Sequence, residues 1–103
     1  KSMMDLGPEG LTETCEDGRA DTEALIRDWG SRGRLGYAIT PRFALSSSDA
    51  QLAGAGALLA RHDHVWMQTH LAESAAEIEA ALRALPGEDF YAHWARQFCG
   101  DEP

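Results

Sequence analysis

Residues 65–69 of this chain read Val-Trp-Met-Gln-Thr, a run nearly continuous in apolar and β-forming residues. Such a run is typical of a parallel strand that is covered on both faces. A second short strand is predicted for residues 35–40, and Pro41 is expected to close it because proline cannot donate to a strand ladder. We also interpret the first few residues of the chain as the end of a further strand.

A polar loop and a first helix are predicted ahead of the residue 35–40 strand. Residues 5–23 hold seven acids against one arginine, and we expect a long surface loop there. Asp21 or Thr22 can then cap a helix, because their side chains accept hydrogen bonds from the first free backbone amides. Three apolar residues supply the buried side of this helix: Leu25, Ile26 and Trp29.

Two further helices are predicted to begin at capping boxes. Ser48 with Gln51, and Ser74 with Glu77, have the three-residue spacing of that motif. The first of these helices is expected to end at His62. The second is expected to bury apolar residues at helical spacing: Ile78, Ala81, Leu82 and Leu85. A short fourth helix is predicted after it, with an aromatic face formed by Phe90, Tyr91, Trp94 and Phe98.

The alternation of strands and helices predicts an α/β fold built from βαβ units with a parallel sheet. Two full strands cannot protect both edges of such a sheet, so we expect the missing strands to come from elsewhere. The 103 residues are therefore expected to form a fragment, residues 1–103, of a single larger domain.

Composition excludes several classes of partner. The chain has 9 basic and 17 acidic residues, a net charge of −8, which argues against nucleic acid and anionic membranes because both require clustered Lys and Arg. The apolar segments are too short to span a bilayer, and the N-terminus does not resemble a signal peptide. Cys15 and Cys99 lie far apart in the sequence, and two free thiols are typical of a reducing cytoplasm.

Two chemically capable segments follow the predicted strands. In parallel α/β folds, reactive residues cluster where strands end and loops begin. Because strand residues alternate between faces, His70 shares a face with Trp66 and Gln68. An imidazole at that end of a strand can bind a metal or move a proton, although a histidine that simply hydrogen-bonds there is the alternative.

Glu73 lies three residues beyond His70, on the turn into the helix capped by Ser74. Near a metal-bound water, a carboxylate in this place can act as general base and then as general acid. The alternative is an acid at a helix start that complements the helix dipole.

Arg42 and Phe43 follow the other strand as a planar cation beside a planar ring. A flat heteroaromatic ligand can stack on Phe and accept directed hydrogen bonds from a guanidinium group. The alternative is a surface ion pair for the arginine and a phenylalanine packed under its own loop.

Three segments, in this order, carry a family resemblance: Met-Met-Asp at residues 3–5, Tyr-Ala-Ile-Thr-Pro-Arg-Phe at 37–43, and Val-Trp-Met-Gln-Thr-His-Leu-Ala-Glu at 65–73. Together they closely resemble the middle of the guanine deaminase family, within the amidohydrolase superfamily. The resemblance extends from residue 1 to about residue 85. It implies a TIM-like (β/α)8 barrel, of which this chain supplies roughly strands three to five with their helices. It also implies one catalytic zinc ion and the conversion of guanine and water to xanthine and ammonia.

The resemblance implies a role for each candidate residue. His70 matches the metal-binding histidine at the end of the fifth barrel strand, and Glu73 matches the glutamate that transfers protons. Arg42 and Phe43 match the pair that recognises the purine. The remaining metal ligands lie outside this chain, so the fragment alone is expected to be inactive. The complete protein is expected to be a cytoplasmic homodimer that acts on a small purine and binds neither nucleic acid nor membranes.

Two alternatives stay open on the sequence. The first is another amidohydrolase that acts on a different aminopurine, a pyrimidine or a triazine. The second is a non-catalytic α/β interaction module whose exposed sheet edges favour pairing with other chains.

Overall fold

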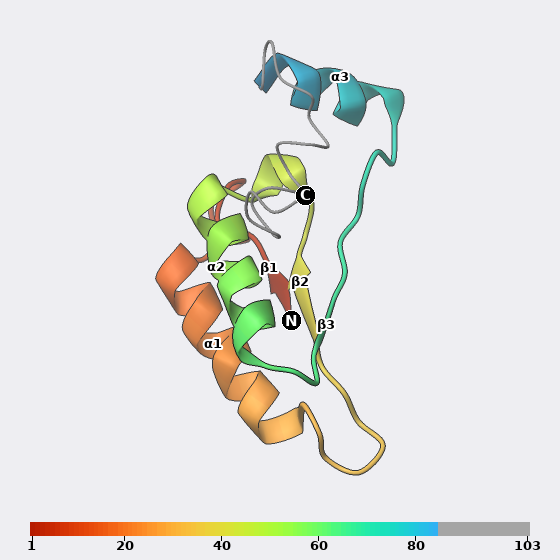
Figure 1. The fold of residues 1–103 in the computed structure, drawn as a ribbon. Coiled ribbons are helices and arrows are strands. Elements are labelled where there is room, and N and C mark those ends of the chain that lie inside the picture. Colours follow the sequence, from red (N-terminus) through yellow and green to blue (C-terminus); the bar gives the residue numbers. More distant parts are fainter. Residues whose placement is uncertain (85–103) are drawn as a thin grey trace.

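The computed structural model describes residues 1–84 (Figure 1). The predicted fourth helix, with its aromatic face, and Cys99 lie outside these residues. Its elements, in chain order, are β1 (Ser2–Met3), α1 (Cys15–Trp29), β2 (Ala38–Pro41), the 3-10 helix η1 (Ala44–Ser46), α2 (Asp49–Arg61), β3 (Trp66–Met67) and α3 (Ala75–Ala84).

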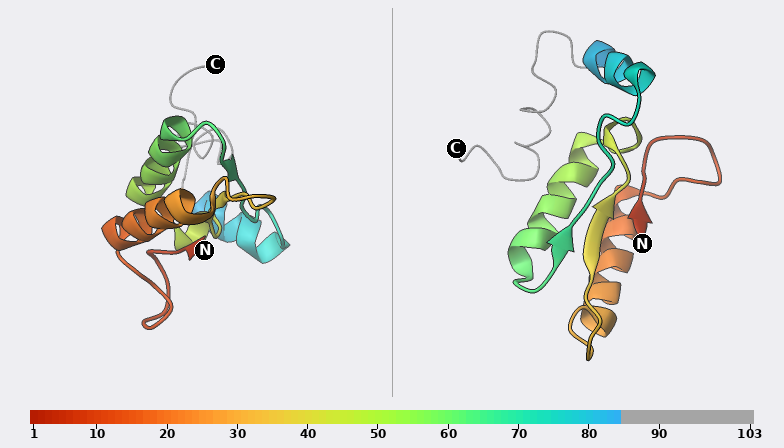
Figure 2. Two further views of the ribbon diagram at one scale, coloured as in Figure 1. Left: turned by 90° about the horizontal axis from the view of Figure 1, so that it is seen from below. Right: turned by 90° about the vertical axis from the view of Figure 1, so that its right-hand side faces the viewer.

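The three strands form one parallel sheet in the order β1-β2-β3 (Figure 2). Ser2 lies opposite Thr40 in the first pair, and Ala38 lies opposite Trp66 in the second. The parallel α/β arrangement predicted from the sequence is therefore confirmed, including the strand at the start of the chain. Parallel strands need crossover connections, which α1 and α2 supply.

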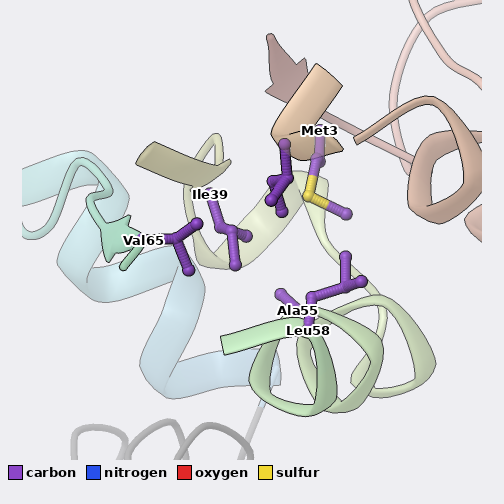
Figure 3. Close-up of a cluster of buried hydrophobic side chains, with 6 residues drawn as sticks. Met3, Ile39, Ala55, Leu58 and Val65 are labelled. Carbon is purple, nitrogen blue, oxygen red and sulfur yellow. The ribbon is translucent and has the colours of Figure 1, made fainter. Parts of the chain in front are cut away.

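The helices occupy two different places around the sheet. α1 and α2 pack against each other on one face of the sheet, whereas α3 lies beyond its carboxyl end, next to η1 (Figures 1 and 2). The core lies between the sheet and the helix pair (Figure 3). Its buried members come from all three strand segments and from both helices: Met3, Ile26, Ile39, Ala55, Leu58 and Val65.

The predicted start of α1 was wrong. The helix begins at Cys15, well inside the expected loop, and its N-cap is Thr14, whose hydroxyl accepts from the amide of Asp17 at 3.1 Å. Thr22, proposed as a cap, is instead fully buried inside the helix. Two of the acids that indicated a loop, Glu16 and Asp17, lie in the first turn, where the positive end of the helix dipole stabilises them.

The other boundaries are closer to the prediction. Ser48 caps α2, whose C-cap is His62, and the Ser74 hydroxyl accepts from the amide of Glu77 ahead of α3. Pro41 ends β2 as expected, although the strand begins only at Ala38. Of α1 to α3, the helices of the described part of the chain, none has the length and apolar character needed to cross a lipid bilayer.

Candidate active site

The carboxyl ends of the three strands lie at the same end of the sheet, because all three run parallel (Figure 1). The backbone of Arg42 joins them there. Its amide donates to the carbonyl of Met3 at 3.0 Å, and its carbonyl accepts from the amide of His70 at 3.2 Å. The Thr69 hydroxyl donates to the same carbonyl at 3.3 Å. Two segments that the sequence singled out separately are therefore in direct contact.

His70 and Glu73 lie side by side at this end of the sheet. Nδ1 of His70 is 3.7 Å from Oε2 of Glu73, and the two side chains are 67% and 59% exposed. The turn between them passes through Ala72, whose φ of 53° lies in the left-handed region that non-glycine residues rarely adopt. This turn brings the carboxylate back towards the imidazole.

The carboxylate that serves the amides ahead of α3 belongs to a different glutamate. Oε2 of Glu77 accepts from the amide of Glu73 at 2.8 Å, while the Ser74 hydroxyl caps the helix proper. Glu77 thus accepts from the amide of Glu73, while the carboxylate of Glu73 lies beside His70.

Arg42 and Phe43 form the second half of the candidate site. The guanidinium carbon of Arg42 lies 5.4 Å from the centre of the Phe43 ring, within the range of a cation–π contact. Its Nη1 lies 3.2 Å from the sulfur of Met4. The ion pairs within residues 1–84 do not include Arg42, so the surface ion pair considered from the sequence is not found there.

The strand alternation predicted for residues 65–70 is confirmed. Val65 is buried and Met67 packs against the core, whereas Trp66 is 75% exposed on the face away from the helices. Gln68 and His70 share that exposed side of the alternation. These residues therefore lie on the sheet face that α1 and α2 leave uncovered.

Sequence reasoning missed one polar link on this face. Nε2 of Gln68 donates to the Thr40 hydroxyl at 3.3 Å, and that hydroxyl donates to the carbonyl of Ala38 at 2.9 Å. The link connects β2 to the segment that leads into His70. The alternation of strand faces that puts His70 on this face also puts Gln68 there, so the same pattern could have identified Gln68.

His62 and Cys15 lie apart from this arrangement. His62 follows α2, at the amino end of β3, and its Nε2 is 3.6 Å from Oε1 of Glu23. Cys15 begins α1, where burial, followed by the nearby negative charges of Glu16 and Asp5, raises the pKa of its thiol. A thiol with a raised pKa is a poor nucleophile at neutral pH.

Comparison with known proteins identifies the relatives of this chain. No protein-family model matches it. The guanine deaminase of Escherichia coli K12 is 41% identical over 92 residues, which are 88% of this chain and 21% of that protein. A probable guanine deaminase of Deinococcus radiodurans is 41% identical over 86 residues, 84% of this chain and 19% of that protein.

The chain is a homologue of one segment of guanine deaminase. Solved structures agree with this result. The E. coli guanine deaminase superposes with a TM-score of 0.88 at 39% identity, over 96% of this chain and 23% of that one. The guanine deaminase of C. acetobutylicum, solved with guanine bound in its active site, gives a TM-score of 0.86 at 30% identity, over 97% and 24%.

The resemblance predicted from the sequence is thus confirmed, and the chain spans about a fifth of the length of the curated relatives it matches. The three-stranded sheet and its helices have the same arrangement as the matching part of solved guanine deaminases. Within residues 1–84, no group of three or more His, Cys, Asp and Glu side chains could hold a metal ion.

Proposed function

We propose that this chain is part of a metal-dependent guanine deaminase, which converts guanine and water to xanthine and ammonia. One observation carries the proposal: the His70–Glu73 pair and the Arg42–Phe43 pair meet at the carboxyl end of one sheet, joined through the carbonyl of Arg42. The relatives named guanine deaminase, one of them solved with guanine bound, support this assignment.

In this proposal the sheet is one sector of a (β/α)8 barrel, with β1, β2 and β3 as its third to fifth strands. Within residues 1–84, the two helices that pack along the sheet, α1 and α2, lie on one face of it, as helices do on the outside of such a barrel. The uncovered face, which carries Trp66, would then line the barrel interior. The candidate residues lie at the carboxyl end, where barrel enzymes place their active sites.

His70, with Glu73 beside it, fits part of a metal site. The carboxylate of Glu73 lies near one ring nitrogen of His70, and a metal-binding histidine commonly has its second nitrogen beside a carboxylate. A catalytic zinc site takes about three protein ligands, so the other donors would come from outside residues 1–84. When bound, a divalent ion such as zinc acidifies water and so supplies a nucleophile at neutral pH.

Glu73 would move protons in this reaction. Its exposed carboxylate can take a proton from the attacking water and deliver it to the purine ring nitrogen or to the leaving amine. His70, 3.7 Å away, would hold the metal and limit the positions that this carboxylate can adopt.

Arg42 and Phe43 would hold the flat substrate. The ring of Phe43 can stack on a purine, and the guanidinium group of Arg42 can donate two directed hydrogen bonds to ring acceptors. Their mutual contact and the backbone attachment of Arg42 to β1 and to His70 orient the pair before substrate binds. Such orientation contributes to rate because the reacting groups need no further ordering.

The test uses the complete protein that contains this chain, with metal content and xanthine formation measured on the same samples. His70→Ala is expected to lower bound metal and abolish turnover. Glu73→Gln is expected to retain the metal and lose turnover by roughly 100-fold or more, the usual contribution of a general acid–base group. His64→Ala is the matched control, because His64 is an exposed histidine at the opposite end of β3. Full turnover in Glu73→Gln would reject the role of Glu73.

Arg42→Ala separates guanine from the other substrates of the wider superfamily. The variant is expected to raise the KM for guanine, because the directed hydrogen bonds to the purine are lost. A KM for guanine that stays the same would reject the role of Arg42 in purine recognition. Turnover of a different aminopurine, a pyrimidine or a triazine, with none of guanine, would reject guanine as the substrate. We also propose, from the family resemblance, that the complete protein is a cytoplasmic homodimer. Sedimentation tests the dimer, and cell fractionation tests the location.

A further inference from the structure

Asp5, which follows β1, contacts the segment that comes after Arg42 and Phe43. The amide of Ser48 donates to Oδ1 of Asp5 at 2.8 Å, and the Ser48 hydroxyl donates to Oδ2. The backbone adds to this attachment, since the amides of Asp5 and Leu6 donate to the carbonyl of Ser46 at 3.1 and 3.2 Å. Residues 5 and 6 thus make four hydrogen bonds to the segment ahead of α2: two to Ser48, the N-cap of α2, and two to Ser46 at the end of η1.

The same segment is fixed to β1 at its other end. The amide of Arg42 donates to the carbonyl of Met3 at 3.0 Å. Between the two attachments, the carbonyl of Phe43 accepts from the amide of Ser46 at 3.1 Å and from its hydroxyl at 3.3 Å, and Ser46 is only 4% exposed. The chain that carries Arg42 and Phe43 is therefore held from both sides by residues 3–6.

The attachment through Asp5 replaces part of the expected capping box. The side chain of Gln51 does not return to the amide of Ser48; it donates to the Ser47 hydroxyl at 3.0 Å. The carboxylate of Asp5 accepts from the Ser48 amide instead. A carboxylate is favoured there by the positive end of the helix dipole of α2. The position of the α2 start thus depends on a side chain from the preceding strand segment.

We propose that Asp5 is a positioning residue for the Arg42–Phe43 pair: it fixes the start of α2 and the preceding turn, and thereby the place at which the pair meets the substrate. This inference rests on the proposed function for its substrate. The placement of the loop itself follows from the contacts of Asp5 alone and can be tested without a reaction.

The kinetic test compares three variants of the complete protein. Asp5→Ala is expected to raise the KM for guanine by roughly 5- to 30-fold, the range that corresponds to the loss of hydrogen bonds to a charged group, while kcat changes much less. Asp5→Asn is expected to restore the KM in part, because the amide oxygen can replace one of the two carboxylate oxygens that accept from Ser48. Thr14→Ala is the matched control, since it removes the N-cap of α1, away from the candidate site.

The second readout is hydrogen exchange of the amides in residues 42–48. Asp5→Ala is expected to exchange faster in this segment, whereas Thr14→Ala is expected to leave it unchanged. Equal KM and equal exchange in Asp5→Ala and Thr14→Ala would overturn the inference. If the complete protein does not deaminate guanine, the proposed function is rejected, and the exchange result alone decides whether Asp5 positions the loop.

Discussion

The region from β1 to α2 and the region of β3 and α3 bury their apolar side chains to different extents. In the first, Ile39 and Leu58 are completely buried between the sheet and its two helices. In the second, Trp66 is 75% exposed and Leu82 is 50% exposed. The apolar residues of α3 are spaced as regularly as those of α2. The two helices differ in what packs against them: within residues 1–84, α2 packs against α1 and β2, whereas α3 contacts mainly η1.

This difference bears on the candidate site, which lies at the border of the two regions. Arg42 belongs to the well-packed region, because its amide is bonded to β1 and its strand crosses the core. His70 and Glu73 belong to the exposed region and are attached through a few backbone hydrogen bonds. Segments with few buried contacts open at lower free-energy cost. The Arg42–Phe43 half of the candidate site is therefore expected to be ordered more firmly than the His70–Glu73 half.

The largest expected effect compares two leucines, one from each region. Leu58→Ala is expected to lower the free energy of unfolding by about 2–5 kcal/mol, because it leaves a cavity in a closed core. Leu82→Ala is expected to cost about 1 kcal/mol or less, since half of that side chain is already exposed. Urea unfolding of the 103-residue chain measures both variants. Equal losses would contradict the contrast between the two regions.

The sequence predicted the fold best where a local signal marked the strand or the helix start. Near-continuous apolar strands and the Ser48 and Ser74 caps each had local signals, and the structure contains them. The start of α1 was missed because its first turn is rich in acids, which a loop and a helix N-terminus share. The spacing of Thr14 and Asp17 was the signal that separated the two.

The candidate site was predictable only in part. The rule that parallel strands end together placed Arg42 and His70 at one edge, and the structure brings them into contact. The positive φ of Ala72 could not be predicted, because alanine has no preference for that conformation. Asp5 was also missed, because its partner Ser48 lies 43 residues away and only the folded chain brings them together.

A smaller effect compares the N-caps of the two regions. Ser48→Ala is expected to lower the free energy of unfolding by about 1–2 kcal/mol, because Ser48 also bonds to Asp5 and is partly buried. Ser74→Ala, at an exposed helix start, is expected to cost about 0.5 kcal/mol. Thermal and urea unfolding measure the two, with the exposed Ser31→Ala as control. A larger loss for Ser74→Ala would mean that α3 is the better anchored helix.

The smallest expected effect is a pH dependence confined to the packed region. Tyr37 packs against the core cluster, and burial raises the pKa of its phenol above the ordinary value of about 10. The unfolded chain therefore releases this proton at a lower pH than the native chain does. Stability from this group is fully present below pH 10 and is lost as the pH rises through the native pKa.

Tyr37→Phe isolates that contribution, because the variant keeps every other group of the chain that titrates at alkaline pH. The difference in free energy of unfolding between the original chain and Tyr37→Phe is expected to be constant from pH 7 to 9. Above about pH 10 it is expected to shift against the original chain. Absorbance of the phenolate at 295 nm, compared between the two proteins, gives the native titration directly. A difference that stays constant up to pH 11, with a phenol that titrates at its ordinary pKa, would show that Tyr37 is not held in the packed region and that the core ends before β2 begins.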